Sequence, residues 1–204
     1  MQISQYLPLS GEGKEVYQKR RSEMYRKNLN RGWEFMQGEP SSIPGMPKET
    51  KTVNLPHDFM VEQDVTADAK GGAEAGFYSG GVGTYIKTLE FLAGELADVM
   101  ELEFDGCFGL TRVSVNGSPA GRHHYGYTPF RVNIRPFVKV GSNRIVVTVN
   151  NDAQPNGRWY SGAGLDRGVK LDTYGRRHIA PDGIFVTTEH QAGNDAATKE
   201  QSTL

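Results

Sequence analysis

Apolar and polar residues alternate along several segments of the chain from Trp33 onward. The clearest case is the segment 100–105, in which Met, Leu and Phe alternate with two Glu and an Asp. Because successive side chains of a strand point to opposite faces, this pattern predicts a strand with one apolar and one acidic face. We expect the acidic face, formed by Glu101, Glu103 and Asp105, to be solvated rather than catalytic.

Other segments show the same period of two. Val113 and Val115 alternate with polar residues and lead into Asn116-Gly117, which predicts a two-residue hairpin turn because both residues tolerate positive φ. Further predicted strands contain Ile145, Val147 and Val149 or span Trp33–Gln37, Lys51–Leu55, Thr84–Phe91, Val169–Tyr174 and Gly183–Thr188. Strands at this spacing, with no long helix between them, predict an all-β fold, a β-sandwich or jelly roll with under roughly 15% helix.

Two long stretches and both ends of the chain depart from this pattern. Residues 56–83 and 150–168 show little periodicity, and loops of this length are usually functional or disordered. Residues 12–27 have a partial apolar face that fits a short helix, although an arm lying over a neighbouring surface or a frayed terminus fits equally well. The small, polar residues of 191–204 are typical of a linker or a truncated end.

Composition excludes several classes of partner. The 204 residues include 25 Gly and 10 Pro, which suits a loop-rich β domain. The net charge of −1 gives no electrostatic basis for binding nucleic acid or an anionic membrane. No apolar run is long enough for a membrane-spanning helix. The N-terminus lacks the basic start and apolar stretch of a secretory signal, so we expect a cytoplasmic protein.

Motifs for metal, cofactor or covalent chemistry are absent from the sequence. His123 and His124 are adjacent, so on a strand they would point to opposite faces, and no other metal-ligand pattern accompanies them. Cys107 is the single cysteine, which excludes an internal disulfide, and we expect it to be a small buried residue. No GxSxG elbow or phosphate-binding glycine pattern occurs. We therefore predict neither a metal nor a cofactor.

Polar and aromatic residues gather in the second irregular stretch. Arg158, Trp159 and Tyr160 follow shortly after Asn151 and Asp152. Sugars are bound by such groups, because aromatic faces pack on C–H surfaces while amide, carboxylate and guanidinium groups bond to hydroxyls. The alternative is structural: the two rings pack under the loop and the arginine pairs with an acid.

Five segments carry a resemblance to a known family: Leu29–Phe35, Asn54–Phe59, Val113–Gly117, Gly126–Phe130 and Arg158–Arg167. Together they resemble the N-terminal domain of glycoside hydrolase family 2, the family of β-galactosidases, β-glucuronidases and β-mannosidases. The last segment is long and specific. Phe59 replaces the Trp of the family's Leu-Pro-His-Asp-Trp motif, and Asp166 stands where many members have an aromatic residue. The version at Arg158–Gly162 is more similar to certain bacterial β-galactosidases than to β-glucuronidases.

The resemblance implies a domain organisation. It implies an arm at 1–28, a galactose-binding-domain-like jelly roll at 29–190, and a linker at 191–204 toward an immunoglobulin-like domain outside this chain. A catalytic barrel farther along the full-length protein would supply both glutamates of a retaining mechanism, so we expect no catalytic residue here. A homo-oligomer of the full-length enzyme is one arrangement that the resemblance allows.

The resemblance also implies a role. The domain would brace the barrel and lend the loop with Asn151, Asp152, Arg158, Trp159 and Tyr160 to a pocket for a β-linked sugar. Two alternatives remain open within carbohydrate recognition: a stand-alone carbohydrate-binding module, and a β-glucuronidase or β-mannosidase in place of a β-galactosidase. A jelly roll that makes no sugar contact is a third.

Overall fold

The computed structural model describes residues 24–40, 49–154, 157–188 and 202–203. Within these ranges the one helical element is the 3-10 turn η1 (Gly72–Ala75), so the predicted low helix content is confirmed. The strands are β1 (Tyr25–Asn28), β2 (Trp33–Gln37), β3 (Lys51–Val53), β4 (His57–Asp58), β5 (Gly81–Phe91), β6 (Val99–Phe104), β7 (Leu110–Val115), β8 (Ser118–His123), β9 (Phe130–Asn133), β10 (Gly141–Asn151), β11 (Gly164–Leu165), β12 (Val169–Tyr174), β13 (Thr187–Thr188) and β14 (Ser202–Thr203).

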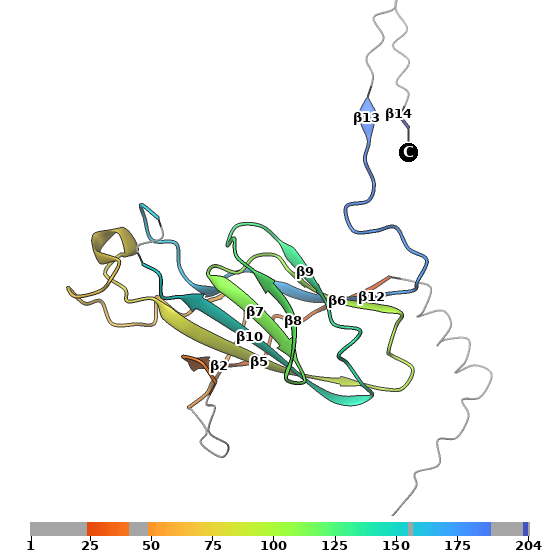
Figure 1. Cartoon of the computed structure of the whole chain (residues 1–204), viewed down its shortest axis with the longest axis horizontal. Helices are drawn as coiled ribbons and strands as arrows, with labels where there is room; N and C mark the ends of the chain where they lie inside the picture. The colour runs from red at the N-terminus through yellow and green to blue at the C-terminus, as the bar shows by residue number, and fades with distance from the viewer. Residues whose placement is uncertain (1–23, 41–48, 155–156, 189–201, 204) are drawn as a thin grey trace, which may run out of the picture.

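Two antiparallel sheets form a jelly-roll β-sandwich, as predicted (Figure 1). The larger sheet has the order β3-β2-β5-β10-β7-β8, and the smaller one β1-β12-β6-β9. Neighbouring strands in these sheets are rarely neighbours in sequence. Strand β1, for example, pairs with β12, with Tyr25 opposite Thr173. The fold therefore depends on contacts between distant parts of the chain.

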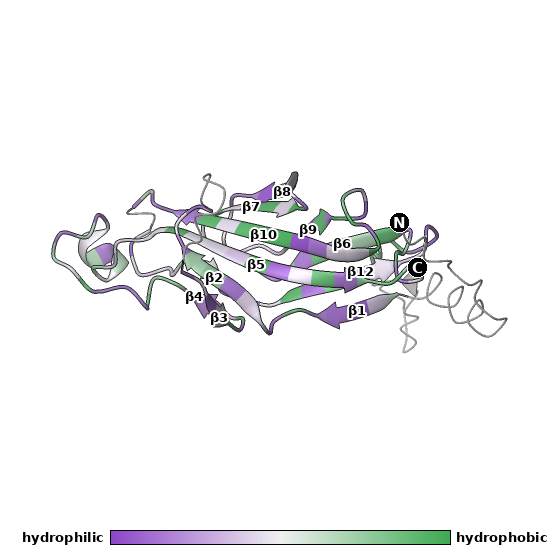
Figure 2. Cartoon of the chain, turned by 90° about the horizontal axis from the view of Figure 1, so that it is seen from below, coloured by the Kyte–Doolittle hydropathy of each residue, from purple (hydrophilic) through white to green (hydrophobic). Residues whose placement is uncertain are grey.

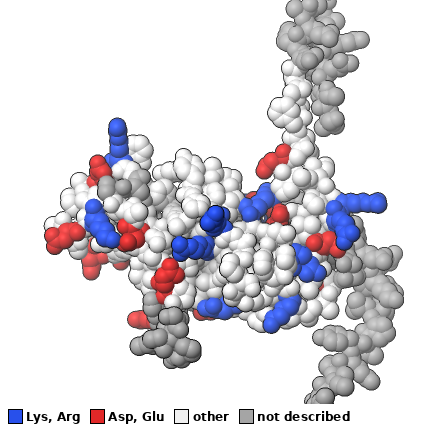
Figure 3. Space-filling model, in the orientation of Figure 1, with Lys and Arg blue, Asp and Glu red and all other residues white. Residues whose placement is uncertain are grey.

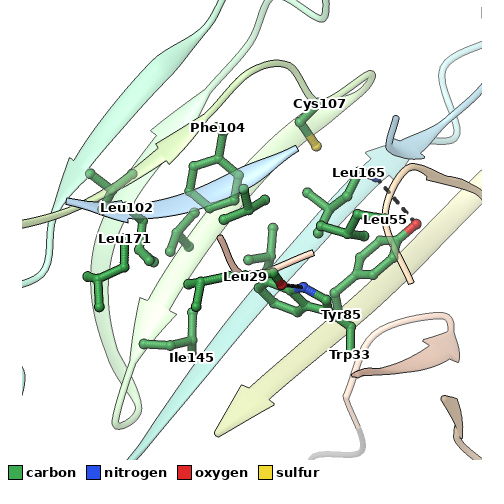
Figure 4. Packing of buried hydrophobic residues seen from close by; sticks show 14 of the residues in the cluster. Leu29, Trp33, Leu55, Tyr85, Leu102, Phe104, Cys107, Ile145, Leu165 and Leu171 are labelled. Atoms are coloured by element: carbon green, nitrogen blue, oxygen red, sulfur yellow. Dashed lines mark hydrogen bonds between the residues drawn. The ribbon is translucent and has the colours of Figure 1, made fainter. Parts of the chain in front are cut away.

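The core lies between the two sheets and contains the apolar faces that the alternation predicts (Figure 2). Met100, Leu102 and Phe104 of β6 are fully buried, and they belong to the same cluster as Ile145 of β10. At one end of the core the indole Nε1 of Trp33 donates to the Leu29 carbonyl oxygen at 2.7 Å (Figure 4). The ring is thus buried with its polar atom satisfied.

Cys107 is a buried apolar residue, as expected. It has no exposed surface, and burial raises the pKa of its thiol to about 12. A thiol that stays protonated at neutral pH is a poor nucleophile.

The Asn116-Gly117 turn is confirmed. Both residues have positive φ, 51° and 84°, and they join β7 to β8 with Val115 opposite Ser118. The Asn116 side chain also forms hydrogen bonds. Its Nδ2 donates to the Phe137 carbonyl oxygen at 2.9 Å, and its Oδ1 accepts from the Arg144 backbone N–H at 2.9 Å. The turn is therefore bonded to two other segments.

The prediction of a solvated acidic face on β6 is wrong. Glu103 is only 7% exposed, because Arg26, Arg131 and Lys170 from three neighbouring strands lie against it. Asp172, beside it on β12, is completely buried and accepts two hydrogen bonds of 2.7 Å from Arg26. Sequence alternation identified the outward face of the strand correctly but could not show that cations from other strands cover it.

The two irregular stretches of the sequence meet at one end of the sandwich, on the left in Figure 1. There β4, from the first stretch, pairs with β11, from the second. At the opposite end the chain leaves the sandwich after β12. The predicted strand at Gly183–Thr188 is shortened to β13, which pairs with β14 and belongs to neither sheet. The end of the predicted helix at 12–27 is strand β1 instead, and its first part lies outside the described residues.

Candidate functional site

The carboxylate of Asp58 joins the two long loops. Its Oδ1 accepts hydrogen bonds of 2.9 Å from the backbone N–H groups of Met60 and Ala163. Its Oδ2 accepts from the hydroxyl of Tyr160 at 2.5 Å. Since bonds to a charged acceptor are stronger than neutral ones, the two bonds from Tyr160 and Ala163 fix the base of the 157–163 loop against β4, while the Met60 bond holds the carboxylate in place.

Two glycines make this close approach achievable. A Cβ on Gly162 would lie 2.6 Å from Asp58 Oδ2, and one on Gly164 would lie 2.5 Å from the carbonyl oxygen of His57. Both residues also have positive φ, 75° and 135°. Side chains are excluded at both positions, which explains why the sequence reads Ser-Gly-Ala-Gly here.

The five predicted site residues divide into two groups. The first lies on the 157–163 loop itself and becomes less exposed from its tip toward the core. Arg158 is exposed, and Trp159 keeps 68% of its surface exposed. Tyr160 lies at the edge between loop and core, with its ring centroid 5.4 Å from that of Tyr78. Burial, and then the hydrogen bond to Asp58, raise the pKa of the Tyr160 hydroxyl, so it stays a donor at neutral pH.

The second group supports the loop. Asn151 is 4% exposed, and its Nδ2 donates to the Gly162 carbonyl oxygen at 3.1 Å, so its amide is used within the protein. Asp152 is exposed and accepts from Lys70 Nζ at 2.8 Å, which links the two loops a second time. Of the five predicted residues, Arg158 and Trp159 are therefore the ones with side chains free to reach outward.

A polar network leads from the buried hydroxyl of Tyr85 through half-buried His57 to exposed Glu62. The Nδ1 of His57 is 2.8 Å from the hydroxyl oxygen of Tyr85, and its Nε2 is 3.3 Å from Glu62 Oε1. The Tyr85 hydroxyl also accepts from the Leu165 backbone N–H at 3.4 Å (Figure 4). Burial lowers the pKa of His57, against the opposing effect of Glu62. The network ties β4 and β11 to the core strand β5.

Among the described residues no group of His, Cys, Asp and Glu is placed to hold a metal ion. None of their helices is long and apolar enough to cross a membrane. Lys, Arg, Asp and Glu are interspersed over the face in Figure 3, so it carries no extended field of one sign. An exposed indole beside an exposed guanidinium suits a polyhydroxylated ligand.

A model of the sugar binding domain of glycosyl hydrolases family 2 matches residues 27–171. The chain belongs to this family. It is 33% identical over 183 residues to the β-galactosidase BoGH2A of Bacteroides ovatus, an alignment that covers 88% of this chain and 22% of that protein. A Formosa agariphila protein named only provisionally as a β-glucuronidase is 34% identical over 167 residues, 79% of this chain and 16% of the relative. The chain thus spans less than a quarter of the length of these relatives.

Solved structures of the family have the same fold. A glycosyl hydrolase family 2 member from Bacteroides cellulosilyticus aligns with a TM-score of 0.74 and 31% identity, over 80% of this chain and 22% of its own. A β-glycosidase from Bacteroides vulgatus aligns with a TM-score of 0.65 and 27% identity, over 72% and 20%.

Sequence reasoning missed the role of Asp58. Asp58 lies within the Asn54–Phe59 motif, but nothing in the local pattern indicates that its carboxylate holds a loop more than a hundred residues away. No local signal singles out Asp58, because the same irregular stretch also contains Glu62, Asp64, Asp68 and Glu74. The hydroxyl of Tyr160 is bonded to Asp58, and the sugar contact of its ring stays a prediction.

Proposed function

We propose that this chain is the non-catalytic N-terminal domain of a bacterial, retaining glycosidase that acts on β-galactosides. Its role is to support the catalytic barrel and to place Arg158 and Trp159 at the rim of the sugar pocket. Two catalytic glutamates of the barrel perform the hydrolysis, one as general acid/base and one as nucleophile. The sandwich takes no part in the bond cleavage itself.

The observation that carries the proposal is the contrast within the 157–163 loop. Its base is fixed by two hydrogen bonds to Asp58, while the Trp159 ring is 68% exposed. An indole combines an apolar ring with a polar N–H, and tryptophan is for this reason enriched at binding surfaces. The guanidinium of Arg158, next to it, has donors that suit sugar hydroxyls or a carboxylate of the barrel.

A β-glucuronidase is the second candidate, because the provisionally named Formosa agariphila relative is as similar in sequence as BoGH2A. The two activities differ in the charge of the sugar, and an arginine at the pocket rim could serve either. The proposal therefore needs a direct comparison of substrates.

The test uses the full-length protein and aryl glycosides. We expect hydrolysis of the β-galactoside at a higher kcat/KM than of the β-glucuronide or the β-mannoside. Arg158→Ala should lower kcat/KM by roughly ten- to a hundredfold, the effect of one or two hydrogen bonds with a charged partner. The control is Arg122→Ala, at an exposed position on β8, which should leave the kinetics unchanged. Failure to hydrolyse any aryl β-glycoside would overturn the proposal.

The 204-residue chain gives a complementary measurement. We expect it not to hydrolyse these substrates. It should bind galactose with a Kd of about 1 mM or weaker, which corresponds to a binding free energy of about −4 kcal/mol at best. The reason is that one side of a shared pocket cannot enclose a ligand. Micromolar binding by calorimetry would favour a stand-alone carbohydrate-binding module.

A further inference from the structure

A groove runs along the open side of the sandwich, where the chain crosses from one sheet to the other. Strand β1 is an edge of the smaller sheet, and residues 29–32 lead from it to β2 in the larger sheet. Strand β2 pairs with β5 only as far as Ile86, so in the described part of the chain residues 87–91 of β5 have no strand on that side. The groove at this crossing has a volume of about 1040 Å³, of the size that small-molecule ligands occupy.

The polar groups along this groove are mainly hydrogen-bond donors. Six of the residues that line it have a cationic or an amide side chain: Lys27, Asn28, Asn30, Arg31, Asn54 and Lys87. The side-chain oxygens of the three asparagines accept from the backbone N–H groups of Asn30, Val169 and Gly32, at 2.8, 2.8 and 3.0 Å. Their Nδ2 groups have no recorded acceptor among the described residues, so these donors can bond to a ligand.

Lys87 places a partly buried cation beneath the groove. It belongs to the inward-facing row of β5, and its Nζ lies 5.9 Å from the centre of the Trp33 ring. The ammonium donates to the backbone carbonyl oxygens of Arg31 and Gly32, which carry no net charge. Burial, and then the charge of Lys27, lower the pKa of Lys87. A cation that is partly removed from water beside a second cation is stabilised by an anion.

The acidic residues of the groove do not balance its cations. Among the described residues that line it, Glu90 is the one acid, against three cations. Lys27 and Arg31 are exposed, and neither forms an ion pair with any residue that the structure describes. On the outer face of the smaller sheet, in contrast, Lys170 is paired with two carboxylates. The groove therefore carries a local excess of positive charge.

We infer that this groove binds a small anionic saccharide, through a carboxylate or similar oxyanion carried on the sugar ring. The cations bind the oxyanion, and the asparagine Nδ2 groups donate to ring hydroxyls. The buried side chains of Leu29, Leu55 and Leu89 also line the groove and offer an apolar surface to the C–H groups of the ring. This combination suits a sugar acid better than a nucleic acid, because the chain as a whole has a net charge of −1.

The groove is separate from the proposed sugar contact at Trp159. None of its described lining residues belongs to the 157–163 loop. The inference therefore does not rest on the proposed function, and both can be tested in the 204-residue chain.

A titration of the 204-residue chain, followed by the NMR shifts of its backbone amides, tests the inference. The probes are galacturonate and galactose, which differ in the carboxylate of galacturonate. Galacturonate should shift the amides of residues 27–31 and 87–90 and bind there at least about tenfold more tightly than galactose. Equal affinities of the two sugars for the groove, or galacturonate shifts confined to the 157–163 loop, would overturn the inference.

Salt and inorganic sulfate identify the part of the ligand that is recognised. Raising NaCl from about 50 to about 200 mM should weaken galacturonate binding severalfold, because salt screens exposed charges. Sulfate should bind the groove at least about tenfold more weakly than galacturonate, because it has no C–H surface for the leucines. Galacturonate binding that is insensitive to salt would contradict recognition of the charge. Sulfate binding as tightly as galacturonate would contradict recognition of the sugar.

Two variants with a matched control give an independent measurement. Lys27→Gln and Arg31→Gln should each lower the affinity for galacturonate about fivefold and leave the melting temperature within about 1 °C, since both side chains are exposed. Arg122→Gln, at an exposed position on β8 outside the groove, is the control and should leave the affinity unchanged. Unchanged affinity in both Lys27→Gln and Arg31→Gln would overturn the inference.

The binding and activity measurements separate this inference from the proposed function. A full-length protein that hydrolyses aryl β-glycosides, with a 204-residue chain whose groove binds no galacturonate, refutes the groove alone. Galacturonate binding in the groove without any glycosidase activity of the full-length protein refutes the enzymatic proposal alone.

Discussion

The carboxylates at two places in this molecule have different kinds of partner. At the loop end, Asp58 accepts from two backbone N–H groups and a tyrosine hydroxyl, and its recorded hydrogen bonds involve no cation. On the outer face of the smaller sheet, Glu103 and Asp172 are surrounded by Arg26, Arg131 and Lys170.

The difference reflects what each site has to do. Backbone donors are directional and hold a loop in one position, which suits the base of the 157–163 loop. Cations from three neighbouring strands neutralise charge over a whole sheet face, and their long side chains cover it. Loss of the single Asp58 carboxylate should therefore lower stability strongly. Loss of one cation beside Glu103 and Asp172 should lower it less, because the other cations remain.

The largest effect is expected at Asp58. Asp58→Ala removes three hydrogen bonds at once and leaves two backbone donors without an acceptor, so we expect a loss of about 3 kcal/mol in the free energy of unfolding. Asp58→Asn keeps one acceptor oxygen and should cost about 1 kcal/mol. Urea unfolding of the 204-residue chain measures both. An Asp58→Ala protein as stable as the unchanged chain would show that the carboxylate does not anchor the junction.

A smaller loss is expected on the charged face. Arg26→Met removes the bidentate partner of Asp172, which is fully buried, but Arg131 remains 3.6 Å away. Because the Arg26 side chain is 43% exposed, we discount the full cost of breaking a buried pair and expect a loss of about 1–2 kcal/mol. A loss larger than that of Asp58→Ala, in the same urea experiment, would reverse the comparison.

Mild acid should act on the loop end. Burial lowers the pKa of His57 below its usual 6.5, so the stability it contributes is full above pH 6.5 and is lost as the pH falls through its folded pKa. The pKa values of Arg26 and Lys170 are raised by their acidic partners and lie far above this window. The melting temperature should be lower at pH 5 than at pH 7, and His57→Gln should make this difference smaller. His124→Gln, at an exposed position, is the control and should leave the drop intact.

The smallest effect on stability is expected at the tip of the 157–163 loop. Arg158→Ala in the 204-residue chain should change the free energy of unfolding by no more than about 0.5 kcal/mol, since an exposed arginine contributes little to folding. The same substitution is expected to impair the full-length enzyme. If the variant chain instead melts like Asp58→Ala, Arg158 belongs to the structural base of the loop and not to the sugar contact.

Much of the sandwich could be predicted because alternation is a local property. Strands β2 and β12 have the predicted bounds, and the turn at Asn116-Gly117 follows from two residues that accept positive φ. The candidate loop at 158–160 was found from residue types and a motif. Of the strand predicted at 183–188 only β13 forms, and it joins neither sheet of the sandwich, because an apolar run shows that a segment is extended but not which sheet it joins.

The sequence by itself determined where strands and turns form and which face of each strand is apolar, since these depend on residues next to one another. Only the tertiary structure decided that Asp58 would meet Tyr160, and Arg26 would meet Asp172, across separations of 102 and 146 residues. Those contacts depend on the order of strands in the sheets, which brings distant segments together. Burial then makes each carboxylate require its partners, because a charge removed from water must be satisfied within the protein.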